Sequence, residues 1–323
     1  SGPAAIGESS RMKIKQSLIG VSLGIAGLLL TACGGSSNPL GDASSQPSQS
    51  GSASAQAAPV VVGSADFTDS KILAEIYSQA LKAKGVESST KLGIGSREIY
   101  IKALQDGSIS AVPEYTGNLL LNFDANATAT TADEVEKSLP AVLPPGIKVL
   151  KASPAVDQDV YVVTKDFSAK NGITSLEDLK KIASTSTLGG PPELEKRAYG
   201  PPGLEKEYGA KFKAFVPYAK YPPKISDLDS NKIQVATFFT TDAVISEKGY
   251  VQLEDPQSMI LPQNVIPLVR SDVADNADAV AALDAVQSAL TTDDLVQLDK
   301  KVDSERQDPA QVAGEWLKSK GLA

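Results

Sequence analysis

The sequence predicts an α/β protein, because short β-branched runs alternate with segments of helical periodicity. Residues 60–62, Val-Val-Val, form one such run, and the glycine and serine after it end a typical buried strand. Thr68 or Asp69 can cap the next segment, whose apolar side chains recur at helical spacing until Gly85 stops it. Repeated alternation of this kind predicts βαβ units and a mainly parallel sheet.

The later elements continue this alternation through the middle of the chain. The expected strands are short apolar runs at residues 90–94, 109–113, 160–164, 233–238 and 251–253. The expected helices span residues 96–105 and 175–182, and another begins near residues 240–242. Beyond Pro267 the pattern is mostly helical, with amphipathic segments at residues 274–290, 293–302 and 309–320.

The first 58 residues have the composition of export and anchoring segments. Residues 1–11 precede a methionine and are interpreted as a cloning remnant or a mis-called start. Residues 12–32 combine a basic start with an apolar run too short for a comfortable membrane span, as in a secretory signal peptide. The Leu-Thr-Ala-Cys sequence that ends at Cys33 resembles the bacterial lipobox, in which the cysteine carries a lipid.

Residues 33–58 would then be a lipid anchor followed by a flexible tether. They are rich in Ser, Gly, Ala, Gln and Pro and have almost no large apolar side chain to bury. Acyl chains on Cys33 would hold the protein at the outer face of the bacterial cytoplasmic membrane.

The composition excludes several kinds of chemistry. The chain has no histidine and one cysteine, which excludes a Ser-His-Asp triad, a histidine-bearing zinc site and an internal disulfide. With 31 Lys+Arg against 39 Asp+Glu, the net charge of -8 disfavours nucleic acid as a partner. Glu114 could suggest a general acid, but no partner carboxylate is identifiable. We therefore expect no enzyme activity, no metal and no cofactor.

Three turns are placed where ligands bind in open α/β sheets, between a strand end and a helix N-terminus. They span residues 63–68, 95–98 and 113–117. Each alone is a weak signal, because every α/β protein has such turns.

Taken together, the turns carry a resemblance that covers residues 59–323. VGSADFTDSKILAEIYSQAL, LGIGSREIYIKAL and VPEYTGNLL are followed in order by PPELEKRAYGPPGLEKEYG, FFTTDAVI, LEDP and NVIPLV. The chain resembles the substrate-binding lipoproteins of glycine betaine/choline/proline-type (osmoprotectant) ABC importers. The most specific blocks are those around Arg197 and residues 114–117.

The resemblance implies a two-lobed periplasmic-binding-protein fold (type II) with two crossover strands. Lobe 1 would comprise residues 59–155 and 265–323, and lobe 2 residues 156–264. The protein would be a monomer that closes on a small-molecule solute at its hinge and delivers it to an ABC permease with its ATPase.

The resemblance also suggests the ligand-binding residues. Tyr115 matches one position of the family's aromatic cage, Phe239 aligns near another, and Arg197 matches an arginine that holds a carboxylate in some members. The complete set of candidates is Ser64, Asp66, Thr68, Arg97, Tyr115, Thr116, Arg197, Phe239, Thr241 and Asn264.

Other cage positions carry side chains that are not aromatic, namely Ser153, Ile225 and Gln263. Weak binding of glycine betaine is therefore expected, unless Tyr218 or Tyr221 supplies a ring. Two alternatives stay open: the same receptor binding a solute without a quaternary ammonium, and an envelope lipoprotein that binds a protein partner.

Overall fold

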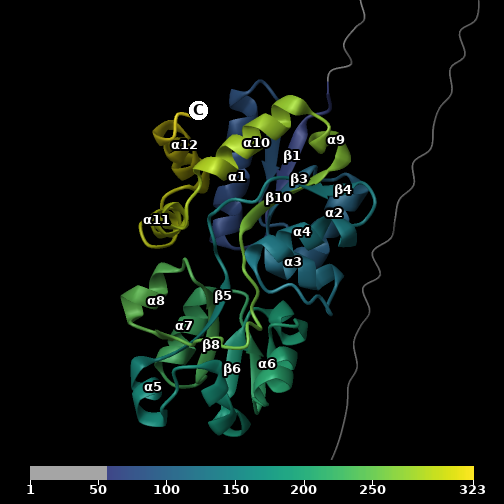
Figure 1. The fold of residues 1–323 in the computed structure, drawn as a ribbon. Helices are drawn as coiled ribbons and strands as arrows, with labels where there is room; N and C mark the ends of the chain where they lie inside the picture. The colour runs from purple at the N-terminus through teal and green to yellow at the C-terminus, as the bar shows by residue number, and fades with distance from the viewer. Residues whose placement is uncertain (1–56) are drawn as a thin grey trace, which may run out of the picture. The chain divides into compact units, whose positions relative to one another are not determined.

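Two five-stranded sheets form the framework of residues 57–323, the part of the chain that the computed structural model describes. Helices flank each sheet and complete two lobes, here named lobe 1 and lobe 2 (Figure 1). Among these residues, no helix is both long and apolar enough to cross a membrane. The predicted signal peptide, the lipidation site Cys33 and nearly all of the tether lie outside the described residues.

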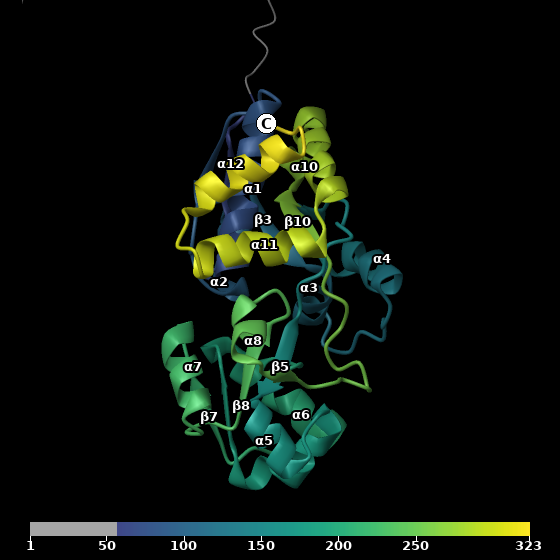
Figure 2. The ribbon, with the colours of Figure 1, turned by 90° about the vertical axis from the view of Figure 1, so that its left-hand side faces the viewer.

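Lobe 1 is built from both ends of the described chain. Its sheet has the order β2-β1-β3-β10-β4, formed by β1 (Val60–Gly63), β2 (Ser88–Lys91), β3 (Ala111–Tyr115), β4 (Ile147–Val149) and β10 (Val265–Arg270). Its helices are α1 (Thr68–Ala83), α2 (Arg97–Asp106), α3 (Thr116–Phe123), α4 (Ala132–Val142), α9 (Ser271–Ala274), α10 (Ala277–Ala289), α11 (Thr292–Asp303) and α12 (Pro309–Ser319). One apolar cluster joins the sheet to α1 and α10–α12, and another joins it to α2–α4. Figure 2 shows α10, α11 and α12 grouped around α1.

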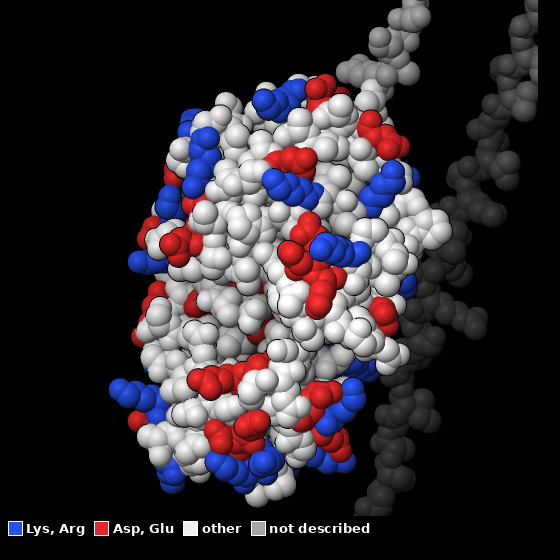
Figure 3. Space-filling view, viewed as in Figure 1, with Lys and Arg blue, Asp and Glu red and all other residues white. Residues whose placement is uncertain are grey.

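Lobe 2 is built from the middle of the chain. Its sheet has the order β7-β6-β8-β5-β9, formed by β5 (Asp159–Val163), β6 (Thr187–Gly190), β7 (Ala214–Pro217), β8 (Val235–Phe239) and β9 (Val251–Gln252). Its helices are α5 (Lys165–Asn171), α6 (Pro201–Tyr208), α7 (Tyr221–Asp229) and α8 (Ala243–Lys248), with 3₁₀ turns η1 (Leu176–Lys181), η2 (Ala183–Thr185) and η3 (Pro192–Lys196). Acidic and basic side chains are interspersed over the face of both lobes seen in Figure 3.

The chain passes between the lobes twice, and the two connecting segments lie side by side. Val156 and Asn264 form an isolated antiparallel bridge between them. On either side of this bridge, the amide of Asp157 donates to the carbonyl of Gln263 at 3.1 Å, and the amide of Val265 donates to the carbonyl of Ala155 at 3.1 Å. Backbone hydrogen bonds thus join the two segments into a short ribbon.

Most of the predicted helices and strands are confirmed, but the predicted mainly parallel sheet is wrong. In lobe 1, β10 runs antiparallel to both β3 and β4, and in lobe 2, β5 runs antiparallel to both β8 and β9. Each antiparallel strand directly follows a connecting segment, so the chain enters each sheet from the side of the other lobe.

The expectation of mostly helix beyond Pro267 overlooked β10, a central strand of lobe 1. Proline cannot donate to a ladder and is rare in central strands. Here Pro267 lies opposite Pro113 of β3, so both missing donors share one rung.

Two local predictions need smaller corrections. The second strand ends at Lys91 rather than residue 94, because Gly93 and Gly95 have positive φ angles of 64° and 130° that turn the chain. The segment 175–182 is a 3₁₀ turn instead of an α-helix, although Ser175 does cap it.

Candidate functional site

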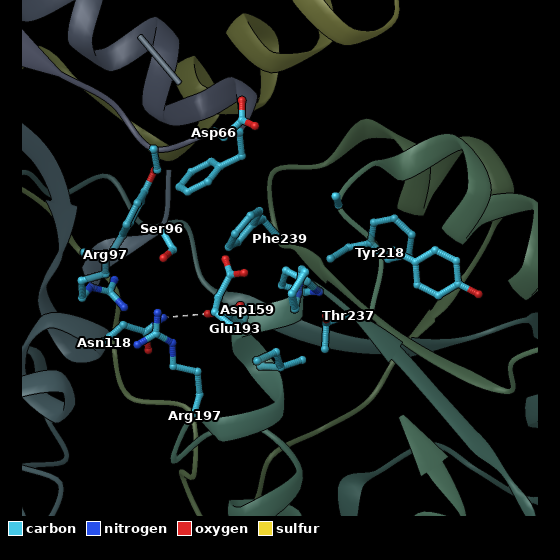
Figure 4. A pocket seen from close by; sticks show the side chains of 18 of the residues that line it. Asp66, Ser96, Arg97, Asn118, Asp159, Glu193, Arg197, Tyr218, Thr237 and Phe239 are labelled. Carbon is cyan, nitrogen blue, oxygen red and sulfur yellow. Dashed lines mark hydrogen bonds between the residues drawn. The ribbon is translucent and has the colours of Figure 1, made fainter. Parts of the chain in front are cut away.

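A cavity of about 290 Å³ lies between the two lobes, at the turns that follow β1, β3, β6, β7 and β8. Aromatic side chains supply much of its wall: Phe67, Tyr100, Tyr115, Tyr199, Tyr218, Tyr221, Phe238 and Phe239. Its charged lining residues are Asp66, Asp157, Asp159, Glu193, Arg97, Arg197 and Lys224. Figure 4 shows Arg97, Asn118 and Arg197 on one side of the cavity and Tyr218 on the opposite side.

Three rings from the two lobes form an aromatic group, which we call the ring trio. Phe67 follows β1 in lobe 1, and its ring centroid lies 4.8 Å from that of Phe239 in lobe 2. Tyr115, at the end of β3, lies 6.0 Å from Phe67 by the same measure. The faces of such rings carry negative potential and attract cations. Contact across the lobes therefore adds the Phe239 ring of lobe 2 to the two rings of lobe 1.

A second aromatic region lies in lobe 2 and already holds a cation of the protein. The ammonium of Lys224 lies 4.3 Å from the ring centroid of Tyr221 and 4.1 Å from that of Phe238. It also donates a hydrogen bond of 2.6 Å to the carbonyl of Thr237. Burial lowers the pKa of Lys224 to about 8, although the carboxylates of Asp242 and Asp159 oppose this shift.

Arg97 lines the cavity, but its guanidinium is bound to a buried carboxylate. Its Nε and Nη2 donate to the two oxygens of Glu114 at 2.7 and 2.9 Å. The carboxylate of Glu114 is fully buried and also accepts from the amide of Tyr115 at 3.0 Å. The bidentate pair neutralises the charge of Arg97 and fixes the turn that carries Tyr115.

Arg197 also lines the cavity, and it is paired across the lobes. Both of its Nη atoms contact the carboxylate of Glu98, with Nη2 donating at 3.0 Å. Glu98 lies in the first turn of α2 in lobe 1, whereas Arg197 follows η3 in lobe 2. The Nε of Arg197 is buried and has no hydrogen-bond partner among residues 57–323.

A cluster of buried carboxyl groups lies next to the ring trio at the junction of the lobes. Asp69 accepts a hydrogen bond from the hydroxyl of Tyr115, and Asp242 accepts one from the hydroxyl of Tyr221 at 2.7 Å. Burial raises the pKa of Asp69 to about 7 and that of Asp242 to about 6. Burial and neighbouring carboxylates also raise the pKa values of Asp157 and Asp299. The carboxyl groups of this cluster therefore titrate at higher pH than ordinary aspartates.

The cavity wall also contains an ordered acidic group. Asp159 accepts a hydrogen bond of 2.7 Å from the side-chain amide of Asn118, shown by the dashed line in Figure 4. Burial raises the pKa of Asp159, while Asn118 and the arginines of the cavity oppose the shift. In residues 57–323, no group of three or more Cys, His, Asp or Glu side chains is arranged to hold a metal ion.

The structure brings five of the ten predicted ligand-binding residues to the cavity wall. These are Asp66, Arg97, Tyr115, Arg197 and Phe239. Asp66 is largely exposed there and pairs with Lys71 at 2.8 Å.

The other five predicted residues do not line the cavity, and their polar side-chain atoms are hydrogen-bonded within the protein. Ser64 accepts from the amide of Gly93, and Thr68 donates to Asp303. The hydroxyl of Thr116 and the side-chain amide of Asn264 brace the connecting segments, and Thr241 donates to Asp299 across the lobes. The structure thus places Ser64, Thr68, Thr116, Thr241 and Asn264 in supporting positions.

The sequence prediction missed Phe67, although it lies inside the quoted turn between two residues that were proposed. The signal was an aromatic residue at a helix N-cap, in the turn between a strand and a helix. Tyr218 and Tyr221, which the alignment could not place, both line the cavity. Gln263, aligned with a lost cage position, is fully buried and exchanges hydrogen bonds of 2.8 and 2.9 Å with Asn118.

Comparison with known proteins identifies a family and several relatives of this chain. The family profile described as the substrate-binding domain of ABC-type glycine betaine transport systems matches residues 58–319. The glycine betaine-binding protein YehZ of Escherichia coli K12 is 28% identical over 279 residues, covering 82% of this chain and 92% of its own. The glycine-betaine-binding protein of Pseudomonas aeruginosa PAO1 is 24% identical over 290 residues, covering 83% of this chain and 90% of its own.

A crystal structure described as a glycine betaine/carnitine/choline ABC transporter superposes with a TM-score of 0.64. It is 19% identical and covers 81% of this chain and 99% of its own, so it establishes the fold alone. The fold is therefore the two-lobed α/β fold of periplasmic binding proteins that the resemblance implied. The match over residues 58–319 establishes that the chain belongs to the family of substrate-binding domains of ABC-type glycine betaine transport systems.

Proposed function

We propose that the protein is the extracytoplasmic solute-binding component of an ABC importer and captures a small osmoprotectant of the glycine betaine, choline and proline betaine class. The observation that carries this proposal is the ring trio of Phe67, Tyr115 and Phe239, in which both lobes contribute rings to one wall of the cavity.

The chemistry of the ligand explains why rings are needed. A quaternary ammonium has no N–H to donate, so aromatic faces are its natural partners, worth about 0.5 to 2 kcal/mol each. Neutral rings also avoid the desolvation penalty that two buried opposite charges incur. Because Phe239 belongs to lobe 2 and Phe67 to lobe 1, a cation that contacts the wall formed by both rings would favour lobe closure.

Arg197 is the proposed partner of an anionic end of the ligand. Arg197 lines the cavity, and a carboxylate that reached its guanidinium would form charge-assisted hydrogen bonds. The expectation of an incomplete cage assumed that only Tyr115 and Phe239 remained. Phe67 and Tyr218 in the cavity wall support a quaternary ammonium ligand more strongly than that alignment did, whereas the Tyr221 ring already contacts the Lys224 ammonium.

Isothermal titration calorimetry with glycine betaine, choline and proline betaine tests the proposal. At least one of them should bind with one-to-one stoichiometry, and Phe239→Ala should weaken it. A matched control is Phe212→Ala, which removes a ring that packs in lobe 2 and does not line the cavity. Absence of binding by all three ligands to correctly folded protein would refute this ligand class.

The proposal also covers how the protein is attached to the membrane, where its two lobes are divided and how they close on the ligand. A lipid on Cys33 would tether the protein, as a monomer, to the outer face of the membrane beside its permease and ATPase. Lobe 1 would comprise residues 59–155 and 265–323, and lobe 2 residues 156–264. Cys33→Ala should move the protein from the membrane fraction to the soluble fraction, and retention after a high-salt wash would contradict the anchor. Small-angle scattering should show a smaller radius of gyration at saturating ligand.

A further inference from the structure

The pairing of Arg197 and Glu98 has features that an ordinary surface ion pair lacks. The Glu98 side chain is 52% exposed, but that of Arg197 is only 12% exposed, and the contact uses both Nη atoms. Exposed single pairs contribute little to stability, because solvent screens them and holding two mobile side chains costs entropy. The Arg197 guanidinium is planar and largely buried, so solvent screens this pair less and ordering the side chain costs less entropy.

Contacts within lobe 1 also fix the position of the Glu98 carboxylate. The hydroxyl of Ser96 donates to the Glu98 carboxylate at 2.8 Å, and Glu98 occupies the first turn of α2, where the helix dipole favours an anion. The carboxylate is therefore positioned toward Arg197 by lobe 1 before the lobes meet.

The nitrogen atoms of the Arg197 guanidinium differ in their hydrogen bonding. The edge formed by the Nη atoms is bound by Glu98, whereas Nε has no partner among residues 57–323. A carboxylate that approaches Arg197 from the cavity meets a cation whose charge Glu98 already neutralises. Because Nε is buried, such a carboxylate must either displace Glu98 from the Nη atoms or share them with it, and both cost free energy.

We propose that Glu98 is a positioning residue that sets the ligand specificity of the cavity by acting through Arg197. It weakens ligands that carry a carboxylate and favours cations that lack one, because it removes the positive charge that Arg197 would otherwise present. The inference rests on the proposed function and deepens it, since it distinguishes ligands within the same class by their anionic group.

The test compares glycine betaine, which carries a carboxylate, with choline, which does not. In Glu98→Gln the charge of Arg197 is no longer neutralised, so glycine betaine should bind more tightly and choline more weakly. The ratio of their dissociation constants should shift by at least about tenfold toward glycine betaine, equivalent to ~1.4 kcal/mol. Glu193→Gln is the matched control: it removes the same charge from an exposed residue of the cavity wall that makes no ion pair with Arg197.

A double-mutant cycle separates an effect through Arg197 from a general change of charge. In an Arg197→Met background, Glu98→Gln should leave the ratio of the two dissociation constants unchanged. A ratio that shifts equally in Glu98→Gln and Glu193→Gln, or that still shifts without Arg197, would overturn the proposal.

Acetate gives a readout that does not require a quaternary ammonium. At equal ionic strength, adjusted with chloride, acetate should raise the melting temperature of Glu98→Gln more than that of the wild-type protein. If acetate behaves in this way but neither glycine betaine nor choline binds, the ligand class is wrong and the role of Glu98 stands. If acetate stabilises both proteins equally, the role of Glu98 is refuted.

Discussion

The buried carboxyl cluster makes the stability of the protein depend on pH in an unusual direction. The folded-state pKa of Asp69 is raised from 3.8 to about 7, and that of Asp242 from 3.8 to about 6, chiefly by burial. A group with a raised folded-state pKa stabilises the fold fully below its unfolded pKa and loses that contribution as pH rises through the folded value. We therefore expect the protein to become more stable as the pH falls from about 8 to about 5.

The size of the effect follows from the same pKa values. Over this range, proton linkage gives at most about 2 to 3 kcal/mol for Asp69 and about 1 kcal/mol for Asp242. The two contributions do not add fully, because the carboxyl groups repel one another when ionised. Lys224, with its pKa lowered to about 8, opposes the trend by less than about 1 kcal/mol, since its unfolded form binds a proton more tightly.

Thermal unfolding monitored by circular dichroism measures this dependence. With about 2 to 4 °C for each kcal/mol in domains of this size, the melting temperature should rise by ~4 to 10 °C between pH 8 and pH 5. The sequence contains no histidine, so no imidazole titrates in this range and obscures the result.

Asp69→Asn should reduce the slope, because an amide carries no charge at either pH. Asp166→Asn, on an exposed turn of α5, is the matched control and should keep the wild-type slope. A melting temperature that stays constant or falls from pH 8 to pH 5 in the wild-type protein would refute the reasoning.

Three further predictions concern ligand affinity and folding. Phe239→Ala should weaken a quaternary ammonium ligand by about 2- to 30-fold in calorimetry, the loss of one ring from the trio, and an unchanged affinity would exclude Phe239 from the site. Glu114→Gln should destabilise the protein by about 3 to 5 kcal/mol in denaturant unfolding, because the buried Arg97 charge loses its partner. A destabilisation under ~1 kcal/mol would mean that water solvates the Arg97 charge in the variant. Gly117→Ala should cost about 1 to 3 kcal/mol, since its Cβ would lie 2.6 Å from the carbonyl oxygen of Pro262. Gly314→Ala, which meets only the flexible end of Gln79 at 3.0 Å, should be close to neutral, and equal costs for both variants would contradict the steric argument.

The sequence predicted those parts of the fold that depend on local patterns. The strand at residues 60–63, the α1 helix and the three C-terminal helices follow from side-chain periodicity, caps and glycine stops, and all are present. The strand β10 could not be predicted in this way, because Pro267 disfavours a central strand unless its neighbour also lacks a donor. That neighbour, Pro113, lies more than a hundred residues earlier in the chain.

Sequence reasoning predicted cavity residues that a single segment identifies, but it did not predict contacts between side chains of the two lobes. Tyr115 and Phe239 were proposed from the resemblance to the family's aromatic cage, and both line the cavity. The partner of Arg197 is Glu98, which lies 99 residues earlier in the other lobe. No local pattern relates these two side chains, so their pairing required the arrangement of the lobes in space.

The return of the chain to lobe 1 determines when that lobe can finish folding. The hydroxyl of Tyr77 in α1 donates to the side chain of Gln287, and Gln79 donates to the carbonyl of Ala310, so α1 depends on the last elements to be synthesised. Lobe 2, a continuous segment, can fold first, while the apolar surface of α1 that packs on α10 and α12 stays uncovered until those helices are synthesised. During synthesis this face is the surface at which aggregation or chaperone binding would start, and the C-terminal helices end that exposure.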